Sequence, residues 1–573
     1  MISPLEAGLW RWAAAAAHRR LPLLLPAIAA LAYVVPFCLH ALVINWDQAH
    51  WIQAGERFAR GQGLTCCPTP GDPLPELDPA HPVYRPITWW PPGYALLVGI
   101  QRQAGVSLQA SCKVINVVPW LAGWFAWGVF LRRVVPPGSP AVLVLLGLPL
   151  SAFFRFTGCG TDVFLWAAVP VWLLAVVAGV RAGSVRKAVG CAALAGLLAG
   201  LAYWARYASL VLVPAGALCL VLLPAGSFRR RVLPLLAFLA VSGLPVGALT
   251  LWKHAADPST SLDPYRNVDR AYDPTRFCTL APVVNFLPAS VSLEYFLRSR
   301  HVRQTLPAAQ GRVLPAVLVL VCLGLALRHA WVLRKGPRPA DGDYLRFLGA
   351  GLLTYLALVG MLAYLSYGYH EMRGTDEWTF LECYRYYQPL YLAGLALVLA
   401  ALLAREPGGT PGGIRLLKAC ALAAVLAAVL CEAAEGTVHA RRYWAQALAG
   451  DPAALQYDLP DTPPVARAIA EVRAQDPATE RAVILAPYYA FFLVASDVPA
   501  YGPGRHLVGP TEPVHVFVVL TEEDRRVSPE EHEWAADFVA RHQLTQVRVG
   551  GLGSARLYHK RIAAGELEAA ADR

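Results

Sequence analysis

Four charged residues stand where they could act on a phosphate ester at a membrane surface. Asp47 follows the first strongly apolar segment, and Asp162 lies in a short polar turn between two later ones. Arg206 and Arg385 lie in the aromatic stretches Tyr-Trp-Ala-Arg-Tyr and Tyr-Arg-Tyr-Tyr, each beside an apolar segment. A carboxylate can accept a proton as a general base, and arginine forms paired hydrogen bonds with phosphate oxygens. This combination indicates transfer of a group from a phosphate-linked, lipid-anchored donor.

Composition places these residues in a membrane protein. Hydrophobic residues make up 56% of the chain and charged residues only 16%, with a mean hydropathy of +0.43. Apolar runs of roughly 17 to 25 residues recur, each long enough to cross a bilayer core of about 30 Å. We predict a polytopic all-α membrane protein with about eleven transmembrane helices. The predicted spans are 21–44, 108–131, 140–157, 163–180, 188–205, 208–224, 232–252, 313–331, 345–366, 388–404 and 416–434.

The positions of Lys and Arg predict the orientation, because short cytoplasmic loops carry an excess of both. Basic residues gather in every second connection, including Arg19 and Arg20, Arg229 to Arg231, and Lys335 with its neighbours. The N-terminus is therefore predicted inside and the C-terminus outside. The net charge of +11 is mostly a consequence of this topology, and it gives no reason to expect nucleic-acid binding.

The polar residues with chemical potential fall on the outer side. That side receives the loops 45–107, 253–312 and 367–387, while the spans are nearly free of charge. A transporter would instead place ionisable residues within its spans. From about 436 charge rises and long apolar runs stop, and the pattern predicts a small α/β domain outside the membrane. We divide the chain into a membrane domain, 1–435, and an extracytoplasmic domain, 436–573.

Several short motifs resemble the GT-C membrane glycosyltransferases that use polyprenyl-phosphate sugars. The similarity is greatest to the branch of the protein O-mannosyltransferases and the lipid A aminoarabinose transferase. Asp47, followed by an Ala-rich helix to Gly61, resembles that family's first-loop acid, and Asp162 stands where the family often has a second one. The other similar stretches are Trp90-Pro91-Pro92-x-Tyr94, Tyr203-Trp204-Ala205-Arg206-Tyr207 and Tyr384-Arg385-Tyr386-Tyr387-x-Pro389.

The resemblance implies an enzyme that moves a sugar from a polyprenyl-phosphate donor to a glycan, lipid or protein acceptor. Asp47 and Asp162 are the implied catalytic residues, with Asp47 as general base of an inverting transfer. The substrate-binding candidates are Arg206, Tyr207, Arg385, Tyr384, Trp90 and Tyr94. The composition, rich in Ala, Arg, Gly and Pro with few Lys, indicates a bacterium of high GC content, and we therefore expect the protein in the inner membrane. Membrane lipids are then further partners.

The sequence leaves alternatives open at each of these positions. Asp47 and Asp162 could cap helices, Arg206 could contact phospholipid, and the Trp residues could form an interfacial belt. The chain could also transfer oligosaccharides from polyprenyl diphosphates, or be a non-catalytic polysaccharide exporter or assembly scaffold. No cofactor is clearly required, because Gln48 replaces the second acid of the family's first-loop pair. A divalent cation would find its best ligands at His370 and Glu371.

The orientation can be tested with reporter fusions. Fusions at residues 230 and 410 should report an inside location, and those at 70, 280, 375 and 500 an outside location, because the connections around the first set carry basic residues with few acids. A reversed pattern would remove the candidate site from the outer surface.

Overall fold

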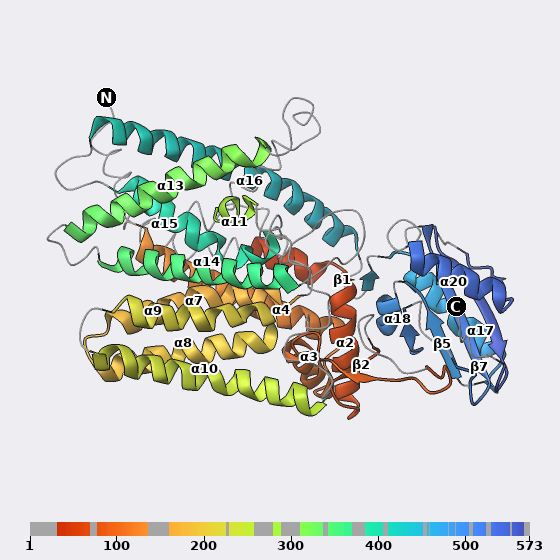
Figure 1. Cartoon of the computed structure of the whole chain (residues 1–573). Coiled ribbons are helices and arrows are strands. Elements are labelled where there is room, and N and C mark those ends of the chain that lie inside the picture. The colour runs from red at the N-terminus through yellow and green to blue at the C-terminus, as the bar shows by residue number, and fades with distance from the viewer. Residues whose placement is uncertain are drawn as a thin grey trace, which may run out of the picture.

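In the computed structural model, apolar helices lie side by side and a small sheet-containing domain sits at one end of them (Figure 1). The structure describes residues 31–68, 77–135, 160–224, 228–256, 279–287, 310–335, 342–368, 384–404, 411–450, 455–457, 459–479, 481–487, 489–502, 508–522, 529–550 and 553–566. The predicted span 140–157 and the motif residues His370 and Glu371 lie outside these ranges.

Seven helices of the described chain are long and apolar enough to cross a membrane. They are α4 (Leu108–Val134), α7 (Asp162–Arg181), α8 (Val185–Ala205), α10 (Phe228–Ala256), α13 (Gln310–Lys335), α14 (Gly342–Gly368) and α16 (Gly412–Ala449). Shorter apolar helical stretches fill two further predicted ranges: η1 (Tyr207–Val211) with α9 (Leu212–Leu222), and η6 (Gln388–Leu390) with α15 (Tyr391–Leu403). The chain is therefore a multi-pass membrane protein with helices where the sequence predicts them, and the count of eleven stays a prediction.

The first predicted span needs a correction at its end. Residues 31–39 are helical, but Leu42–Ile44 form strand β1 and not the last turn of a helix. β1 pairs in parallel with β4 (Leu455–Tyr457), far along the chain. Strand pairing with a distant segment is a tertiary contact, which an apolar run such as Leu-Val-Ile cannot reveal by its own pattern.

Small residues allow the helices of the membrane domain to approach closely. A Cβ atom on Gly196 of α8 would lie 2.5 Å from the Phe238 carbonyl oxygen of α10. A Cβ on Gly200, one turn later, would lie 2.8 Å from the Pro245 ring. Glycines four residues apart let two helix backbones pack together in a membrane, where burial of apolar surface gives no driving force. This contact fixes the C-terminal end of α8, which carries Arg206.

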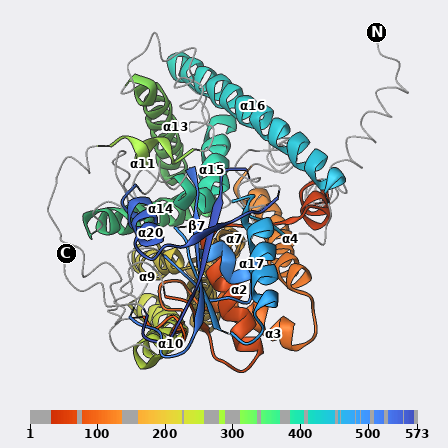
Figure 2. The same ribbon diagram turned by 90° about the vertical axis from the view of Figure 1, so that its right-hand side faces the viewer.

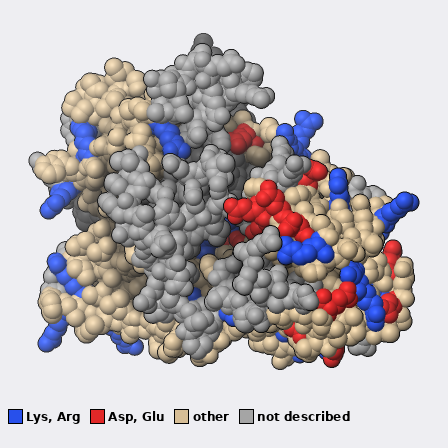
Figure 3. All heavy atoms as spheres, turned by 45° about the vertical axis from the view of Figure 1, so that its right-hand side comes forward, with Lys and Arg blue, Asp and Glu red and all other residues tan. Residues whose placement is uncertain are grey.

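Charge is distributed unevenly over the surface (Figure 3). On the visible face, Lys and Arg gather at the end of the helices remote from the sheet domain, whereas the sheet domain carries both signs. An excess of basic residues at one end agrees with the predicted inside end.

The first loop folds into an interfacial layer at the other end of the helices. It contains α2 (Trp46–Ala59), β2 (Thr65–Cys66), β3 (Arg85–Pro86) and α3 (Gly93–Gln103), with β2 and β3 antiparallel. The predicted outer loops 253–312 and 367–387 contain the short helices α11 (Ala281–Val284) and η5 (Tyr384–Tyr386). The expected Ala-rich helix after Asp47 is confirmed as α2.

The C-terminal region forms a five-stranded mixed sheet with helices, as predicted. The strand order is β6-β5-β7-β9-β8, with β5 parallel to β6 and β7, and β9 antiparallel to β7 and β8. The bounds are α17 (Thr462–Gln475), β5 (Arg481–Leu485), α18 (Tyr489–Ala495), β6 (Ala500–Tyr501), β7 (Val514–Leu520), α20 (Pro529–Arg541), β8 (Thr545–Val547) and β9 (Arg556–Ile562). The apolar patterns predict strands at 482–486, 514–520 and 546–549 and helices at 464–474 and 529–542, which the structure has as β5, β7, β8, α17 and α20. The patterns do not predict α18, β6 or β9.

This domain and the first loop share one hydrophobic core. The core contains Trp51 of α2 and Tyr94 of α3 together with Phe492 of α18 and Phe517 of β7. Figure 2 looks onto the sheet domain, with β7 and α17 in front of α2. The two parts of the chain are therefore packed as one unit around this core.

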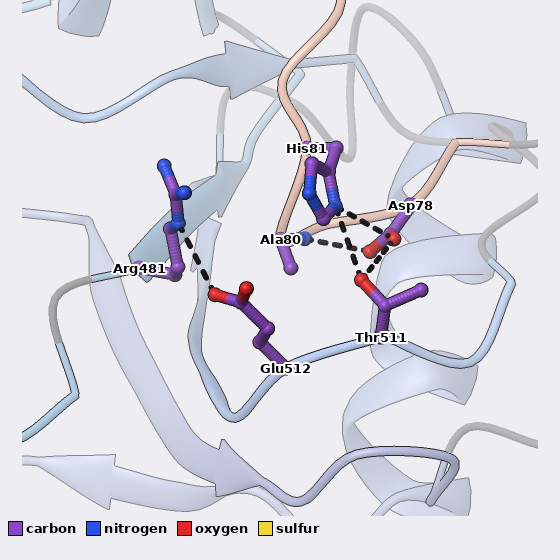
Figure 4. Close-up of polar contacts among 6 residues, drawn as sticks. All are labelled: Asp78, Ala80, His81, Arg481, Thr511 and Glu512. Atoms are coloured by element: carbon purple, nitrogen blue, oxygen red, sulfur yellow. Dashed lines mark hydrogen bonds and ion pairs between the residues drawn. The ribbon is translucent and has the colours of Figure 1, made fainter.

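Polar contacts join the same two parts at their edge (Figure 4). The Thr511 hydroxyl donates to the Asp78 carboxylate at 2.9 Å, and His81 Nδ1 lies 3.0 Å from the same oxygen. The Val508 N–H donates to the Leu77 carbonyl at 3.2 Å. These bonds tie residues 77–81 of the first loop to the segment before β7.

Asp461 should stabilise the C-terminal sheet. Its carboxylate accepts backbone N–H groups of Gly553, Ser554 and Ala555 at 2.8, 2.9 and 2.8 Å, just before β9. Burial opposes ionisation, but the three N–H donors outweigh it and hold the pKa of Asp461 below its usual value. Asp461→Asn should cost about 2 kcal/mol, since the amide nitrogen would face N–H donors.

Hydrogen exchange of peptides covering 545–562 would measure this loss. Because the folded-state pKa is lowered, the stabilisation is present above the ordinary Asp pKa and disappears as pH falls through the folded value. Asp497→Asn, at an exposed acid that pairs with Arg473 at 2.8 Å, is the control. Equal protection in both variants would contradict the assignment.

Candidate active site

Asp47 lies in the first turn of α2 and does not cap the helix. The cap is Asn45, whose side chain accepts the Gln48 N–H, while the Gln48 side chain accepts the Asn45 N–H. This reciprocal capping box fixes the start of α2 and leaves the Asp47 carboxylate available for other contacts. It also explains Gln48: the residue that replaces the second acid of the family motif serves the cap.

The Asp47 side chain is half-buried and lies next to other charged groups. Trp90 donates a side-chain hydrogen bond to it, and Arg385, Arg206 and Asp162 are near enough to influence its ionisation. Burial raises the pKa of Asp47 above the usual Asp value, and the two arginines and the Trp90 bond reduce that rise without cancelling it. A carboxylate with a raised pKa is a stronger base, which suits proton abstraction from a hydroxyl group.

Asp162, the first residue of α7, binds both arginines. One carboxylate oxygen forms an ion pair with Arg206 Nη1, and the other accepts a hydrogen bond from Arg385 Nε at 2.7 Å. Side-chain exposure is 13% for Asp162, 10% for Arg206 and 43% for Arg385. The site is therefore closed on the Arg206 side and open on the Arg385 side. Asp162 is paired with cations, so helix capping does not describe its role.

Arg206 occupies the break between α8 and η1. Its backbone is extended there, with φ −152° and ψ 123°, which turns the side chain away from the α8 helix path. The guanidinium carbon lies 5.3 Å from the centroid of the Tyr386 ring, and Nη1 is 3.4 Å from the Thr161 hydroxyl. Arg385 comes from η5, beside Tyr386. Four segments far apart in the sequence thus meet at one cluster of two acids and two arginines.

Tyr94 is connected to this cluster through Asn116. It is fully buried, and its hydroxyl accepts a hydrogen bond from the Asn116 amide at 3.1 Å. The Asn116 side-chain oxygen accepts the Gly160 N–H at 3.1 Å, two residues before Asp162. These contacts fix the turn that presents Asp162, so we propose that Tyr94 positions the site without touching substrate.

Tyr207 and Lys253 form a second edge of the site. The Tyr207 hydroxyl donates to the Thr88 carbonyl at 3.0 Å, and Lys253 Nζ lies 4.6 Å from the centroid of the Tyr207 ring. Lys253 is buried, with 8% exposure, near the C-terminal end of α10. The sequence analysis missed this residue. The available signal was its positive charge, because a Lys at the predicted outer end of a span departs from the positive-inside rule.

The side chains of three further candidates lie outside the part of the chain that the structure describes. The backbone of Tyr384 begins η5, but its side chain lies outside the described part of the chain, as do His370 and Glu371. Within the described ranges, no group of three or more His, Cys, Asp and Glu side chains could hold a metal ion.

Comparisons with known proteins give a likeness in structure alone. No protein-family description matches the chain, and neither does any curated protein. ArnT from Cupriavidus metallidurans bound to undecaprenyl phosphate is similar at 13% identity and TM-score 0.47, over 94% of this chain and 97% of that one. The Archaeoglobus fulgidus oligosaccharyltransferase tethered to an acceptor peptide is similar at 14% identity and TM-score 0.42, over 88% and 70%.

Asp162→Asn should destabilise the protein, because it removes the carboxylate that both guanidinium groups bind. Breaking a buried pair costs about 3 to 5 kcal/mol. Since Arg385 is 43% exposed and partly screened by water, we expect a loss of about 2 kcal/mol. Thermal unfolding in detergent would measure it.

Asp343→Asn is a matched control for this substitution. Asp343 also lies in the first turn of a helix, α14, and binds two arginines, Arg181 at 2.7 Å and Arg346 at 3.4 Å, but in a more exposed setting. Its loss should cost less than about 1 kcal/mol. Equal losses in the two variants would show that the Asp162 cluster is no more than a surface ion pair.

Proposed function

We propose that this chain is a membrane glycosyltransferase of GT-C type, working at the outer face of the membrane. It would move a sugar from a polyprenyl-phosphate donor to an acceptor hydroxyl. One observation carries the proposal: a carboxylate with a raised pKa lies beside two arginines that a second carboxylate holds in place. A base next to a phosphate-binding pair is what such a transfer needs.

In this proposal Asp47 removes the proton from the acceptor hydroxyl, and the resulting oxygen attacks the anomeric carbon. The bond from that carbon to the phosphate oxygen breaks, and its electron pair leaves with the polyprenyl phosphate. A single displacement of this kind inverts the anomeric centre. The proton ends on the Asp47 carboxylate and must leave before the next turnover.

Arg385 and Arg206 would hold the phosphate. Arg385 lies on the open side, so we assign it the first contact with the donor, and the buried Arg206 supports it with charge. Asp162 keeps both cations in the site when no donor is bound, and a phosphate would compete with it for their N–H groups. Lys253 adds a third positive charge at the Tyr207 edge. This division makes Asp162 a positioning residue and leaves Asp47 as the single base.

The acceptor would approach across the interfacial layer. α2, the Trp90 segment and the C-terminal sheet domain lie together at the outer end of the helices (Figure 1). We therefore propose the outer face of a bacterial inner membrane as the place of reaction, with a glycan, lipid or protein as acceptor.

Release of polyprenyl phosphate by the purified protein tests the proposal. With a panel of polyprenyl-phosphate sugars and membrane extract as the acceptor source, the wild type should turn over. Asp47→Asn should lower kcat by about 10²- to 10⁴-fold, because the amide cannot accept the proton. Asp343→Asn, whose carboxylate lies elsewhere on Arg181 and Arg346, should retain activity.

The pH dependence of kcat gives a second readout. The base must be ionised, so the rate should rise with pH through the pKa of Asp47 and then level off. Because burial raises that pKa, the loss of rate on acidification should begin at a higher pH than for an ordinary Asp, whose pKa is about 3.9. Turnover that survives in Asp47→Asn would keep the transferase and remove Asp47 as its base. Turnover with a diphosphate-linked oligosaccharide alone would favour a ligase or polymerase.

A further inference from the structure

α18 of the C-terminal domain packs against the start of α2, where Asp47 lies. Tyr489, the first residue of α18, is fully buried, and its ring meets that of Trp46 edge-on at 4.8 Å between centroids. Its hydroxyl lies 3.3 Å from His50 Nε2 and donates to the Pro68 carbonyl at 3.0 Å. Tyr489 therefore contacts α2 on both sides of Asp47, one residue before it and three residues after it.

His50 connects this tyrosine to the residue that bonds Asp47. Its ring stacks on Trp90, with centroids 4.7 Å apart and planes 29° apart. Trp90 in turn donates its side-chain hydrogen bond to the Asp47 carboxylate. The order of contacts is Tyr489, His50, Trp90, Asp47, and each step is a direct ring contact or hydrogen bond.

The hydrogen bonds of His50 define its tautomer. Nδ1 lies 3.1 Å from the Trp46 carbonyl, which can only accept, so Nδ1 carries the proton. Nε2 is then an acceptor that faces the Tyr489 hydroxyl. Burial lowers the pKa of His50 to about 4, so the ring stays neutral near pH 7. A neutral ring places no extra cation beside Trp90, and the Tyr489 hydroxyl, which has a single proton, is within hydrogen-bond distance of both Nε2 and the Pro68 carbonyl.

We propose that Tyr489 and His50 are positioning residues for Asp47, and that through them the C-terminal domain holds the base of the membrane domain in its working geometry. The inference rests on the proposed function for the role of Asp47, while the contact chain itself can be tested without any substrate. The domain's part in the reaction is thus to fix the carboxylate and the indole N–H that bonds it.

Tyr489→Phe is the discriminating variant, because it keeps the ring that packs on Trp46 and removes only the hydroxyl. We expect kcat to fall on the order of tenfold, with little change in the KM for the donor, since small misplacements of a reacting group are costly. The midpoint of the kcat pH profile should rise, because a loosened Trp90 bond stabilises the charged carboxylate less.

Tyr501→Phe is the matched control. The Tyr501 hydroxyl, on β6 of the same domain, accepts the Val83 N–H at 3.1 Å and so also joins the domain to the first loop. The Tyr501→Phe variant should have a kcat and a pH midpoint close to those of the wild type. Equal effects of the two substitutions would reduce the contact to general docking and overturn the proposal.

A substrate-free measurement separates this inference from the proposed function. With 5-fluorotryptophan incorporated and the Trp90 signal assigned from Trp90→Phe, the ¹⁹F resonance of Trp90 should titrate with Asp47, and Asp47→Asn should abolish the titration. Tyr489→Phe should raise its midpoint. An unmoved midpoint in a folded variant would overturn the positioning role, whether or not the protein transfers sugars.

His50→Phe gives a second variant should Tyr489→Phe fold poorly. It keeps a flat ring against Trp90 but removes the Nε2 acceptor and the Nδ1 bond to the Trp46 carbonyl, and it should raise the midpoint in the same direction. The double variant should then show no larger shift than His50→Phe alone, because Tyr489 acts through His50. Additive shifts would mean independent effects and contradict the chain of contacts.

Discussion

The structure of the candidate site depends on the pairing of Asp162 with Arg206 and Arg385. Arginines stripped of water are costly in a low-dielectric setting, and the attraction of a well-placed carboxylate is what offsets that cost. One oxygen takes each guanidinium, so both carboxylate oxygens are used. Because the three residues come from α7, the end of α8 and η5, this pairing also fixes where those segments meet. A phosphate brought to the arginines would enter a site that is already assembled.

The surroundings of the pair keep it in place through packing and backbone contacts. The glycines of α8 let α10 approach, and a Cβ on Gly93 would lie 2.5 Å from the Trp204 carbonyl oxygen, so α3 begins directly against the end of α8. Tyr94, one residue later, reaches Asn116 and through it the turn before Asp162. The main role of the Trp-Pro-Pro-Gly-Tyr stretch is therefore structural, because it packs the first loop against the membrane helices.

The C-terminal domain and the first loop are packed together as one folded unit. A shared hydrophobic core, the pairing of β1 with β4 and the contacts of Tyr489 and Tyr501 join them. The C-terminal domain packs over α2, and this packing contributes to the burial that raises the pKa of Asp47. Under the proposed function, the stability of this domain and the reactivity of Asp47 are linked, which gives a physical reason for the presence of the domain.

The sequence by itself determined the class of the protein, most helix positions and the residue types of the site. Apolar length and basic flanks act locally, so α4, α7, α8, α10, α13, α14 and α16 could be predicted from their own residues. The convergence of Asp47, Asp162, Arg206 and Arg385 was an expectation drawn from motif resemblance, and no local pattern required it. Only the tertiary structure decided that Asp162 binds both arginines, that Tyr94 is buried, and that Lys253 joins the site. The strand at Leu42–Ile44 and the contact of Tyr489 with α2 were equally hidden, because each depends on a partner hundreds of residues away that no local pattern identifies.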